Sequence, residues 1–364
     1  MIAACGGETI APPAGIEDPS GLLAPVLPAT AFAYRVAANP LPAHFLTPAP
    51  NGSVASADNS PATNPITDAG ATLGRVLFYD VRLSANNTVS CGSCHQQAFG
   101  VADTPRFSRG FFGALTPRHT SGLSNARFYA NGRFFWDERA ATLEAQVLVP
   151  IQDVSEMGMT LDSLERKLAA TTFYAPLFQA AFGAAEVTRM RVANALAQFV
   201  RALVTANSRY DQAFRGGPAA NFAAVLTPQE VQGEQLFRGA AGCSRCHVTN
   251  AQIANGVHNS GLDLVTADSG AGRGRFKVPS LRNVGVRGRF MHDGRFTALR
   301  QVVDHYDNGV RDNPDLDSLL RTPAGGPQRL QLSPGQRDAI VAYLNTLTDP
   351  TFLIDAKFSN PFRR

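Results

Sequence analysis

The sequence contains two copies of the pentapeptide CxxCH: Cys91-Gly92-Ser93-Cys94-His95 and Cys243-Ser244-Arg245-Cys246-His247. They use four of the five cysteines in a chain of 364 residues. Two thiols on one helical turn can add to the two vinyl groups of a haem, and the adjacent histidine then faces the iron as an axial ligand. The pair of motifs therefore predicts a di-haem c-type cytochrome. A zinc half-site or a disulfide is the alternative for each pentapeptide.

Covalent haem attachment of this type takes place outside the cytoplasm, so we expect a periplasmic or cell-envelope protein. Hydrophobic residues make up 44% of the chain and charged residues 17%, which is sufficient for two domains of ordinary size. The net charge of +4 is modest and does not indicate nucleic-acid binding. No apolar run approaches the roughly eighteen residues that span a membrane.

The fifth cysteine lies near the amino terminus, in Ile2-Ala3-Ala4-Cys5-Gly6-Gly7. Small residues before a cysteine and a glycine after it resemble the lipidation site of bacterial lipoproteins. The usual charged and apolar export segment does not precede it, which indicates a misassigned start codon or a missing part of the signal. We expect a lipid anchor at Cys5, and an unmodified cysteine in a disordered tail is the alternative.

Composition and a weak internal repeat divide the chain into three expected parts. Residues 1–65 are rich in Pro, Ala, Gly, Ser and Asn and predict a tether, followed by an N-terminal haem domain (66–217) and a C-terminal haem domain (218–364). The boundary is placed at Gly216-Gly217-Pro218. The repeat consists of Gly74-Arg75-Val76-Leu77-Phe78 before the first CxxCH and Gly233-Glu234-Gln235-Leu236-Phe237 before the second.

Helical patterns dominate the two expected domains. One buried helix face is predicted by the apolar stripe Val192, Leu196, Phe199 and Leu203. Two helix starts are predicted by Thr227-Pro228-Gln229-Glu230 and Ser333-Pro334-Gly335-Gln336, each with an N-cap hydroxyl and proline at N1. Strand-like alternation is scarce. We therefore expect a mainly α fold with two cytochrome c-like haem domains and long loops, preceded by a disordered N-terminal tether.

Further motifs lie before, between and after the haem motifs in a fixed order, beginning with the stretch from Leu73-Gly74 through His95. They are Leu73-Gly74, Arg133-Phe134-Phe135-Trp136-Asp137-Glu138-Arg139-Ala140, Glu156-Met157-Gly158-Met159, Val278-Pro279-Ser280-Leu281-Arg282-Asn283 and Phe290-Met291-His292-Asp293-Gly294-Arg295. With this set the chain resembles the bacterial di-haem cytochrome c peroxidases and the MauG-type enzymes over roughly residues 66–350.

The resemblance assigns different roles to the two haems. Peroxide reacts at the N-terminal haem, held by His95, and the C-terminal haem, held by His247, stores or relays electrons. Glu156 matches the residue that moves a proton between the peroxide oxygens, with a solvent-facing glutamate as the alternative. Trp136 is the only tryptophan and matches the aromatic ring between the haems, whereas a core tryptophan is the ordinary interpretation.

Two departures from the peroxidases concern the axial ligands. Many of them carry a histidine sixteen residues after the first CxxCH histidine, where this chain has Phe111, so we expect an open or water-bound first haem in the oxidised protein. A shifted loop would bring His119 near the iron instead. At the second haem, the peroxidase methionine is replaced by Tyr306, as in MauG-type enzymes, which lowers the potential relative to methionine. Met291 is the alternative ligand, and a helix-face aromatic is the ordinary interpretation of Tyr306.

The resemblance also implies a calcium ion between the domains, bound largely through backbone carbonyls and water. The matching positions are His119, Arg287 and Arg289, and two arginines beside a divalent cation are unfavourable. Backbone oxygens remain, so Ca2+ stays an expected but unsettled cofactor beside two covalent haems. His258, in another family segment, is interpreted as structural or as a contact of a haem carboxylate.

The leading functional hypothesis is a peroxidase that reduces hydrogen peroxide with electrons from a small cytochrome c or copper protein. A MauG-like enzyme that uses peroxide to oxidise a protein or other donor through a high-valent di-haem state is the second. A non-enzymatic di-haem electron carrier is the third, and Phe111 argues against it because a pure carrier keeps both irons six-coordinate. Haem-based sensing has no supporting signal domain. A homodimer is compatible with the family.

Overall fold

The computed structural model describes residues 21–47, 53–253 and 256–362. Its helices are α1 (Ala43–Leu46), α2 (Asp68–Tyr79), α3 (Cys91–Cys94), α4 (Leu143–Gln152), α5 (Leu161–Ala169), α6 (Tyr174–Phe182), α7 (Arg189–Ala202), α8 (Arg209–Gln212), α9 (Pro228–Arg238), α10 (Leu299–Asp304) and α11 (Pro334–Asn345). The described residues form one sheet, the antiparallel pair β1 (Val257–His258) and β2 (Phe276–Lys277). The expected mainly α fold with long loops is confirmed.

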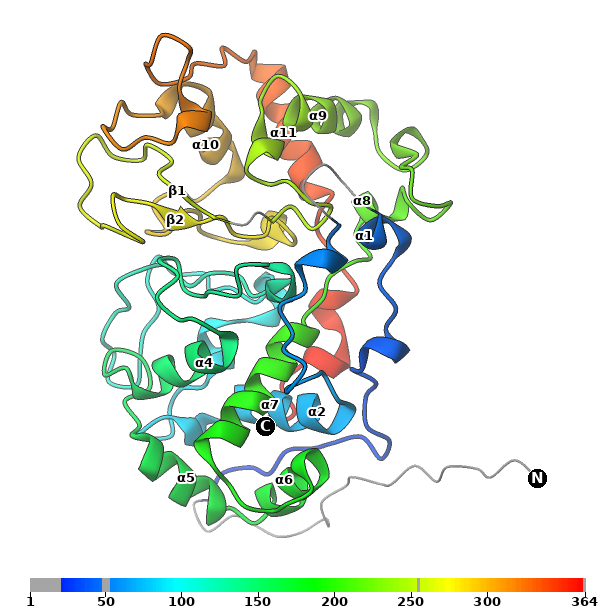
Figure 1. Cartoon of the computed structure of the whole chain (residues 1–364), viewed down its shortest axis with the longest axis vertical. Coiled ribbons are helices and arrows are strands. Elements are labelled where there is room, and N and C mark those ends of the chain that lie inside the picture. Colours follow the sequence, from blue (N-terminus) through cyan, green and yellow to red (C-terminus); the bar gives the residue numbers. More distant parts are fainter. Residues whose placement is uncertain (1–20, 48–52, 254–255, 363–364) are drawn as a thin grey trace.

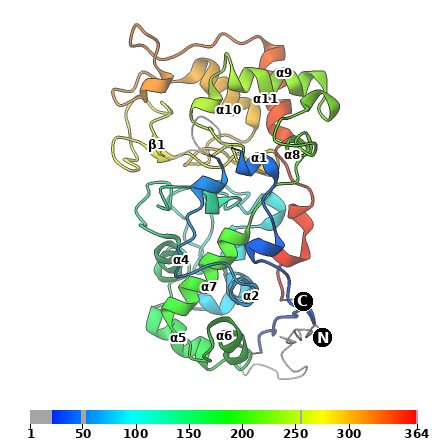
Figure 2. The same cartoon turned by 45° about the vertical axis from the view of Figure 1, so that its right-hand side comes forward.

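The helices form two lobes, one above the other in Figures 1 and 2. The first lobe contains α2 and α4 to α7, and the second contains α9 to α11 and the small sheet. Each lobe has its own hydrophobic core. A smaller cluster that includes Phe45, Phe128 and Ile253 joins residues from both lobes.

The internal repeat has a physical cause, which is the crossing of two helices in each lobe. A Cβ atom at Gly74 of α2 would lie 2.0 Å from the Ala195 carbonyl oxygen of α7, and one at Gly233 of α9 would lie 1.9 Å from that of Ala339 in α11. Only glycine permits these close approaches. Four residues later, Phe78 and Phe237 place their rings 6.3 Å from the rings of His95 and His247, respectively. The repeat therefore builds the same helix pair behind each haem motif.

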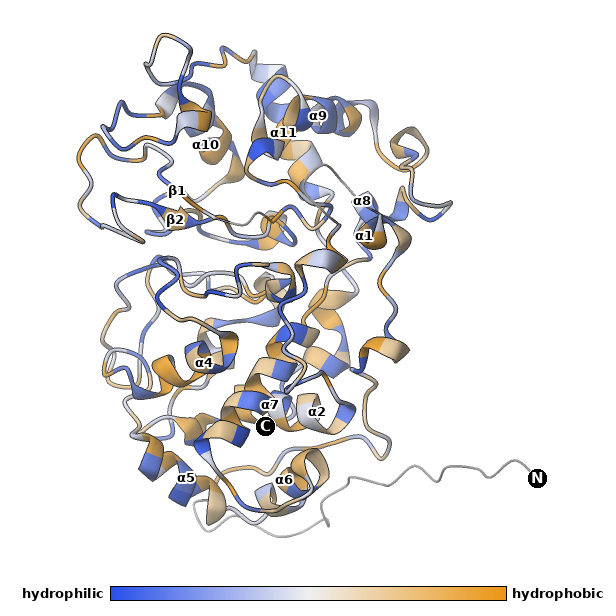
Figure 3. Ribbon diagram, in the orientation of Figure 1, coloured by the Kyte–Doolittle hydropathy of each residue, from blue (hydrophilic) through white to orange (hydrophobic). Residues whose placement is uncertain are grey.

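The predicted helix starts and the predicted buried stripe are confirmed. Thr227 and Ser333 cap α9 and α11 through capping boxes with proline in the first turn. Val192, Leu196 and Phe199 are buried in α7, and Leu203 is buried at its C-cap. Hydrophilic and hydrophobic bands alternate on α5 and α9 in Figure 3, as expected for helices at the surface of a lobe. No helix in the described ranges is both long and apolar enough to cross a membrane.

The expected tether over residues 1–65 needs correction where the structure describes it. Tyr34, Phe45 and Val54 are buried, and Val26 N–H donates to the Pro361 carbonyl at 2.8 Å. The described part of this segment packs as a strap along both lobes, and its regular structure is limited to α1 and single turns of helix, too short to leave a helical periodicity. Residues 1–20, including Cys5 and the expected lipid anchor, lie outside the described residues.

The carboxyl-terminal end also crosses the expected domain boundary. Phe352 and Phe358 belong to the core of the first lobe, and Gln97 Nε2 donates to the Phe352 carbonyl at 2.7 Å. Figure 1 shows this last segment, in red, beside α2 and α7. The expected domain 218–364 therefore includes residues that pack on the first lobe. Composition around residues 216–218 could not reveal this return of the chain.

Candidate haem sites

The first CxxCH motif lies on the wall of a cavity of about 620 Å3, within the range of small-molecule and cofactor sites. Its cysteines occupy α3, which Ser90 caps through a capping box with Ser93. Cys91, Cys94 and His95 all line the cavity. Burial raises the pKa of Cys91 to about 12 and that of Cys94 to about 11. Both thiols face one space together, as thioether attachment to a haem requires.

Hydrogen bonding fixes the orientation of the His95 ring. Its Nδ1 lies 3.1 Å from the Val101 carbonyl oxygen, so Nδ1 carries the proton and Nε2 is left as the metal-binding nitrogen. The same carbonyl accepts the Leu123 N–H at 3.2 Å. Burial lowers the pKa of His95 and favours the neutral ring that ligation needs.

The second CxxCH motif repeats this arrangement beside a cavity of about 210 Å3. Cys243, Cys246 and His247 line it. The Nδ1 of His247 lies 3.2 Å from the Gln252 carbonyl oxygen, which also accepts the Leu281 N–H at 3.2 Å. Burial lowers the pKa of His247 to about 4. The donor set of each cavity therefore fits one covalently attached haem with a histidine ligand.

The alternatives to haem attachment find no support in the structure. The four motif cysteines are free thiols. Within the described residues, no group of three or more His, Cys, Asp or Glu side chains is arranged to hold a metal ion. The zinc and disulfide interpretations of CxxCH therefore have no geometric basis.

A second segment is also repeated in the two lobes, and its equivalent positions are 156 residues apart. In the first lobe a backbone bridge joins Phe134 to Ala140, and α4 begins at residue 143. In the second lobe the equivalent bridge joins residues 290 and 296, and α10 begins at residue 299. In this register Trp136 corresponds to His292, and Pro150 corresponds to Tyr306. Pro150 lines the first cavity and Tyr306 the second. Proline carries no side-chain donor, so the two cavities differ at the same structural position.

Tyr306 lies in an unusual backbone element, a π-helical turn over His305–Gly309 that follows α10. Such turns occur often at functional sites. Burial raises the pKa of the Tyr306 phenol well above its ordinary value, and the Cys246 and Cys243 thiols are near enough to add to the effect. Met291, the alternative ligand, lines the same cavity. The structure thus places both candidates at the second site.

Glu156 lines the first cavity, as expected for a residue that handles a proton there. A tight turn presents it: Glu156 N–H donates to the Asp153 carbonyl at 3.0 Å, and the Glu156 carbonyl accepts the Phe111 N–H at 2.8 Å. Burial raises the pKa of Glu156 to about 7, and the nearby Asp153 charge adds to the rise. The carboxyl can therefore both accept and release a proton near neutral pH.

Phe111 offers no iron ligand, because phenylalanine has no donor atom. Among the described residues that line the first cavity, Gly110 is present and Phe111 is not. The Phe111 ring packs against Gly158 and stands 4.1 Å from the Phe112 ring, measured between centroids. The Phe111 N–H donates to the Glu156 carbonyl, which holds this loop against the Glu156 turn. Neither Phe111 nor Pro150 therefore offers a side-chain ligand to the first site.

Trp136 lies on the wall shared by the two cavities, where the prediction placed it. Its Nε1 donates to the His119 carbonyl at 2.7 Å, and the His119 N–H donates to the His292 carbonyl at 2.8 Å. The Lys277 N–H donates to the Trp136 carbonyl at 2.8 Å. His119 also lines both cavities, but these bonds make its backbone a link between the lobes. The shared wall is therefore held rigidly from both sides.

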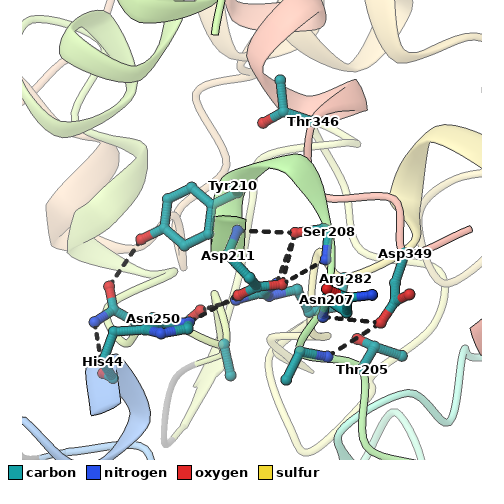
Figure 4. Close-up of polar contacts among 12 residues, drawn as sticks. His44, Thr205, Asn207, Ser208, Tyr210, Asp211, Asn250, Arg282, Thr346 and Asp349 are labelled. Carbon is teal, nitrogen blue, oxygen red and sulfur yellow. Dashed lines mark hydrogen bonds and ion pairs between the residues drawn. The ribbon is translucent and has the colours of Figure 1, made fainter. Parts of the chain in front are cut away.

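A buried ionic cluster around Asp211, drawn in Figure 4, lies next in space to the turn that supports the second haem motif. Arg282 donates to both oxygens of Asp211, at 2.6 and 2.8 Å, and His44 Nε2 lies 2.8 Å from the same carboxylate. Burial opposes ionisation of Asp211, but the Arg282 charge and the hydrogen bond with His44 hold its pKa well below the usual range.

The cluster reaches the turn that orients His247. Arg282 donates to the Asn250 carbonyl, and Asn250 Nδ2 donates to the His44 carbonyl at 2.8 Å. Asn250 lies two residues before Gln252, the partner of His247. The sequence did not predict this cluster, because His44, Asp211 and Arg282 come from three distant segments. It also did not lead us to Pro150, although the 156-residue offset between the lobes could have revealed that position.

The positions matched to a calcium site hold a positive charge instead. Arg287 and Arg289 both line the second cavity. At an effective dielectric constant of about 20, a divalent ion about 4 Å from a guanidinium would be repelled by about 8 kcal/mol. The two arginine side chains therefore oppose calcium binding, and Ca2+ bound through backbone oxygens stays a prediction. His258 also lines the second cavity, and its Nδ1 lies 2.6 Å from Asp317.

Comparisons with known proteins agree with this arrangement. A family model described as di-haem cytochrome c peroxidase matches residues 68–219, and a cytochrome c model matches residues 230–348. The chain is 35% identical over 300 residues to the methylamine utilization protein MauG of Methylorubrum extorquens, covering 79% of this chain and 80% of that protein. It is 33% identical over 255 residues to cytochrome c551 peroxidase of Nitrosomonas europaea, covering 67% and 74%.

Solved structures show the same fold. A MauG-like protein associated with microbial copper homeostasis superposes with a TM-score of 0.75 at 29% identity, covering 84% of this chain and 97% of that one. The diheme peroxidase BthA from Burkholderia thailandensis gives a TM-score of 0.65 at 24% identity, covering 82% and 91%. With its two haem sites and these similarities, the chain belongs to the family of peroxide-dependent di-haem oxidoreductases formed by the cytochrome c peroxidases and MauG.

Proposed function

We propose that this protein reduces hydrogen peroxide to water at its first haem site, with electrons that pass through the second. The observation that carries the proposal is the asymmetry between the cavities. Pro150 offers no ligand to the first cavity, whereas Tyr306 lines the second cavity at the matching position. One site is thereby left open for peroxide, and the other is suited to storing oxidising equivalents.

Glu156 is the proposed proton carrier. When bound, the haems supply iron and the electrons that break the O–O bond. The Glu156 carboxylate accepts the proton from one peroxide oxygen and delivers it to the other, which leaves as water. Two electrons and two protons convert each peroxide into two waters. A pKa of about 7 suits both transfers at neutral pH.

Trp136 is the proposed electron bridge. Its indole ring lines both cavities. The position of the residue is fixed, because its Nε1 and its carbonyl oxygen are both hydrogen-bonded. A rigid indole between two redox centres can pass an electron or hold a hole. The bonds to His119 and Lys277 keep the ring in one orientation.

Tyr306 is the proposed axial ligand of the second haem, in preference to Met291. A phenol with a raised pKa stays protonated without a cation, and ferric iron supplies the charge that stabilises the phenolate. Phenolate ligation favours oxidised iron. This preference supports a second candidate function, in which peroxide is used to oxidise a protein or other donor, as the likeness to MauG proteins also suggests.

Stopped-flow mixing of the ferric holoprotein with hydrogen peroxide tests the proposal. We expect rapid spectral change without prior reduction, followed by oxidation of ferrous cytochrome c under turnover. Oxidation of a protein partner but not of cytochrome c would favour the MauG-like alternative. No reaction with peroxide would overturn both and leave a di-haem electron carrier.

We further propose a periplasmic or cell-envelope location, with a small cytochrome c or copper protein as the electron donor. The covalent haem motifs support the location, because such haems are attached outside the cytoplasm. A lipid anchor at Cys5 and a homodimer remain proposals of the same kind. Mass spectrometry of the native amino terminus and sedimentation of the holoprotein test them.

A further inference from the structure

Arg287 is a partly buried cation with a fully buried Nε, and its counter-charge is not found among the described residues. Its Nη2 donates to the Arg282 carbonyl at 2.8 Å, and its Nε has no hydrogen-bond partner. Among the described residues no carboxylate forms an ion pair with it, and burial is the one influence on its pKa. Arg282 and Arg201 are neutralised by Asp211 and Glu144, whereas Arg75 resembles Arg287 in having no ion pair within the described ranges but lies outside both cavities. Burial alone lowers the pKa of Arg287 to about 10.

The guanidinium lies at the junction of the lobes, beside the wall that the two cavities share. Arg287 lines the second cavity. A Cβ atom at Gly122 would lie 2.6 Å from Arg287 Nη2, and Gly122 lines both cavities. The Arg287 charge also helps to lower the pKa of His119, another residue of this wall. The missing anion must therefore approach from the cavities.

A haem brings its own anions, the two carboxylates on its propionate arms. A buried guanidinium without a carboxylate is costly, and a charge-assisted bond to a carboxylate offsets that cost. We propose that Arg287 is a built-in cation that binds haem carboxylate at the lobe junction and takes the place of a divalent metal ion there. This inference rests on haem occupancy of the second cavity, which is part of the proposed function.

The inference explains why the positions expected to surround calcium carry arginine. A guanidinium is permanently charged and donates along fixed directions, so it can neutralise a carboxylate without an exchangeable ion. The link between the two haem sites would then be independent of calcium concentration. The positive charge would also raise the reduction potential of the nearest haem, because it disfavours the ferric state.

The test compares the holoprotein with Arg287→Gln and Arg287→Lys, with Arg273→Gln as the matched control. Arg273 lies in the same lobe, and its side chain is 77% exposed and 3.7 Å from Asp315. Redox titration without peroxide gives the potential of each haem. We expect Arg287→Gln to lower the second-haem potential by at least a ten-fold change in the reduction equilibrium, about 59 mV. Arg287→Lys should restore most of the difference, and Arg273→Gln should leave it unchanged.

Calcium titration of the unmodified holoprotein after chelation provides a second readout that needs no variant. We expect no stoichiometric heat of Ca2+ binding and no change in either potential. Stoichiometric binding that shifts the potentials would overturn the inference, and so would an unchanged potential in an Arg287→Gln protein that retains both haems. Because neither measurement uses peroxide, a protein without peroxidase activity could still show the potential shift, so the two failures are distinguishable.

Discussion

Replacing Glu156 with glutamine should separate the activity of the first haem site from its stability. The carboxyl borders the cavity, and burial raises its pKa from 4.5 to about 7. Glutamine has nearly the same shape but cannot carry a proton between oxygens. Proton transfer by a positioned side chain typically contributes about 10²–10⁴-fold to a rate. We therefore expect Glu156→Gln to react with peroxide about 10²–10⁴-fold more slowly at pH 8.

The pH dependence follows from the same pKa. Proton acceptance requires the carboxylate, so the rate constant with peroxide should rise as the pH increases through about 7. Asp153 raises the pKa of Glu156 and Arg139 lowers it. Asp153→Asn should therefore move the midpoint to lower pH, and Arg139→Gln should move it to higher pH. Glu156→Gln should remove this titration altogether.

As the pH rises, the unfolding free energy should fall while the rate constant with peroxide increases. The folded protein keeps the Glu156 proton up to pH about 7, whereas the unfolded chain loses it near 4.5. The unfolding free energy therefore falls as the pH rises through this window. The rise in pKa corresponds to at most about 3 kcal/mol, an upper limit because the carboxyl borders the cavity and is partly screened there. Glu156→Gln should be more stable than the original protein at pH 8 by up to this amount.

Stopped-flow kinetics and denaturant unfolding of the holoprotein, both from pH 5 to 8.5, measure the two effects. Glu186→Gln is the matched control, because Glu186 is 73% exposed and lies outside both cavities. That variant should behave like the original protein. Glu156→Gln with an unchanged rate constant and an unchanged pH profile would refute the role of Glu156.

Four further variants test the second site and the bridge. Trp136→Phe should slow electron transfer between the haems while both remain attached, and flash-initiated transfer at the original rate would contradict this. Tyr306→Phe should convert the second ferric haem from low to high spin, whereas Met291→Leu should not, and the reverse pattern would make Met291 the ligand. Asp211→Asn should lower the unfolding free energy by about 3–5 kcal/mol, because it leaves Arg282 as a buried charge without a carboxylate. Chemical denaturation measures this loss. A change below about 1 kcal/mol would show that the cluster contributes little to stability.

Local patterns predicted a large part of this molecule. The CxxCH pairs, the caps at Thr227 and Ser333 and the apolar stripe of α7 each depend on residues close in sequence, and the structure has all of them. Trp136 and Glu156 line the first cavity as expected. Their proposed roles remain predictions for the experiments above.

Long-range packing could not be predicted in the same way. The strap that carries His44 has no periodicity, and its partner Asp211 is 167 residues away. The return of Phe352 to the first lobe likewise leaves no trace in local composition. The packing of the Phe111 ring against Gly158 depends on a turn 47 residues away in the sequence, which counting from His95 could not reveal. Tertiary contacts outweighed sequence pattern at each of these places.

We propose that one haem site is open and the other closed, because Pro150 and Tyr306 occupy matching positions. Low-temperature electron paramagnetic resonance of the fully oxidised holoprotein tests it most directly. We predict one high-spin and one low-spin ferric signal of equal intensity, with the high-spin signal alone changing when a small anionic ligand such as cyanide is added. Two low-spin signals before any addition would contradict the account.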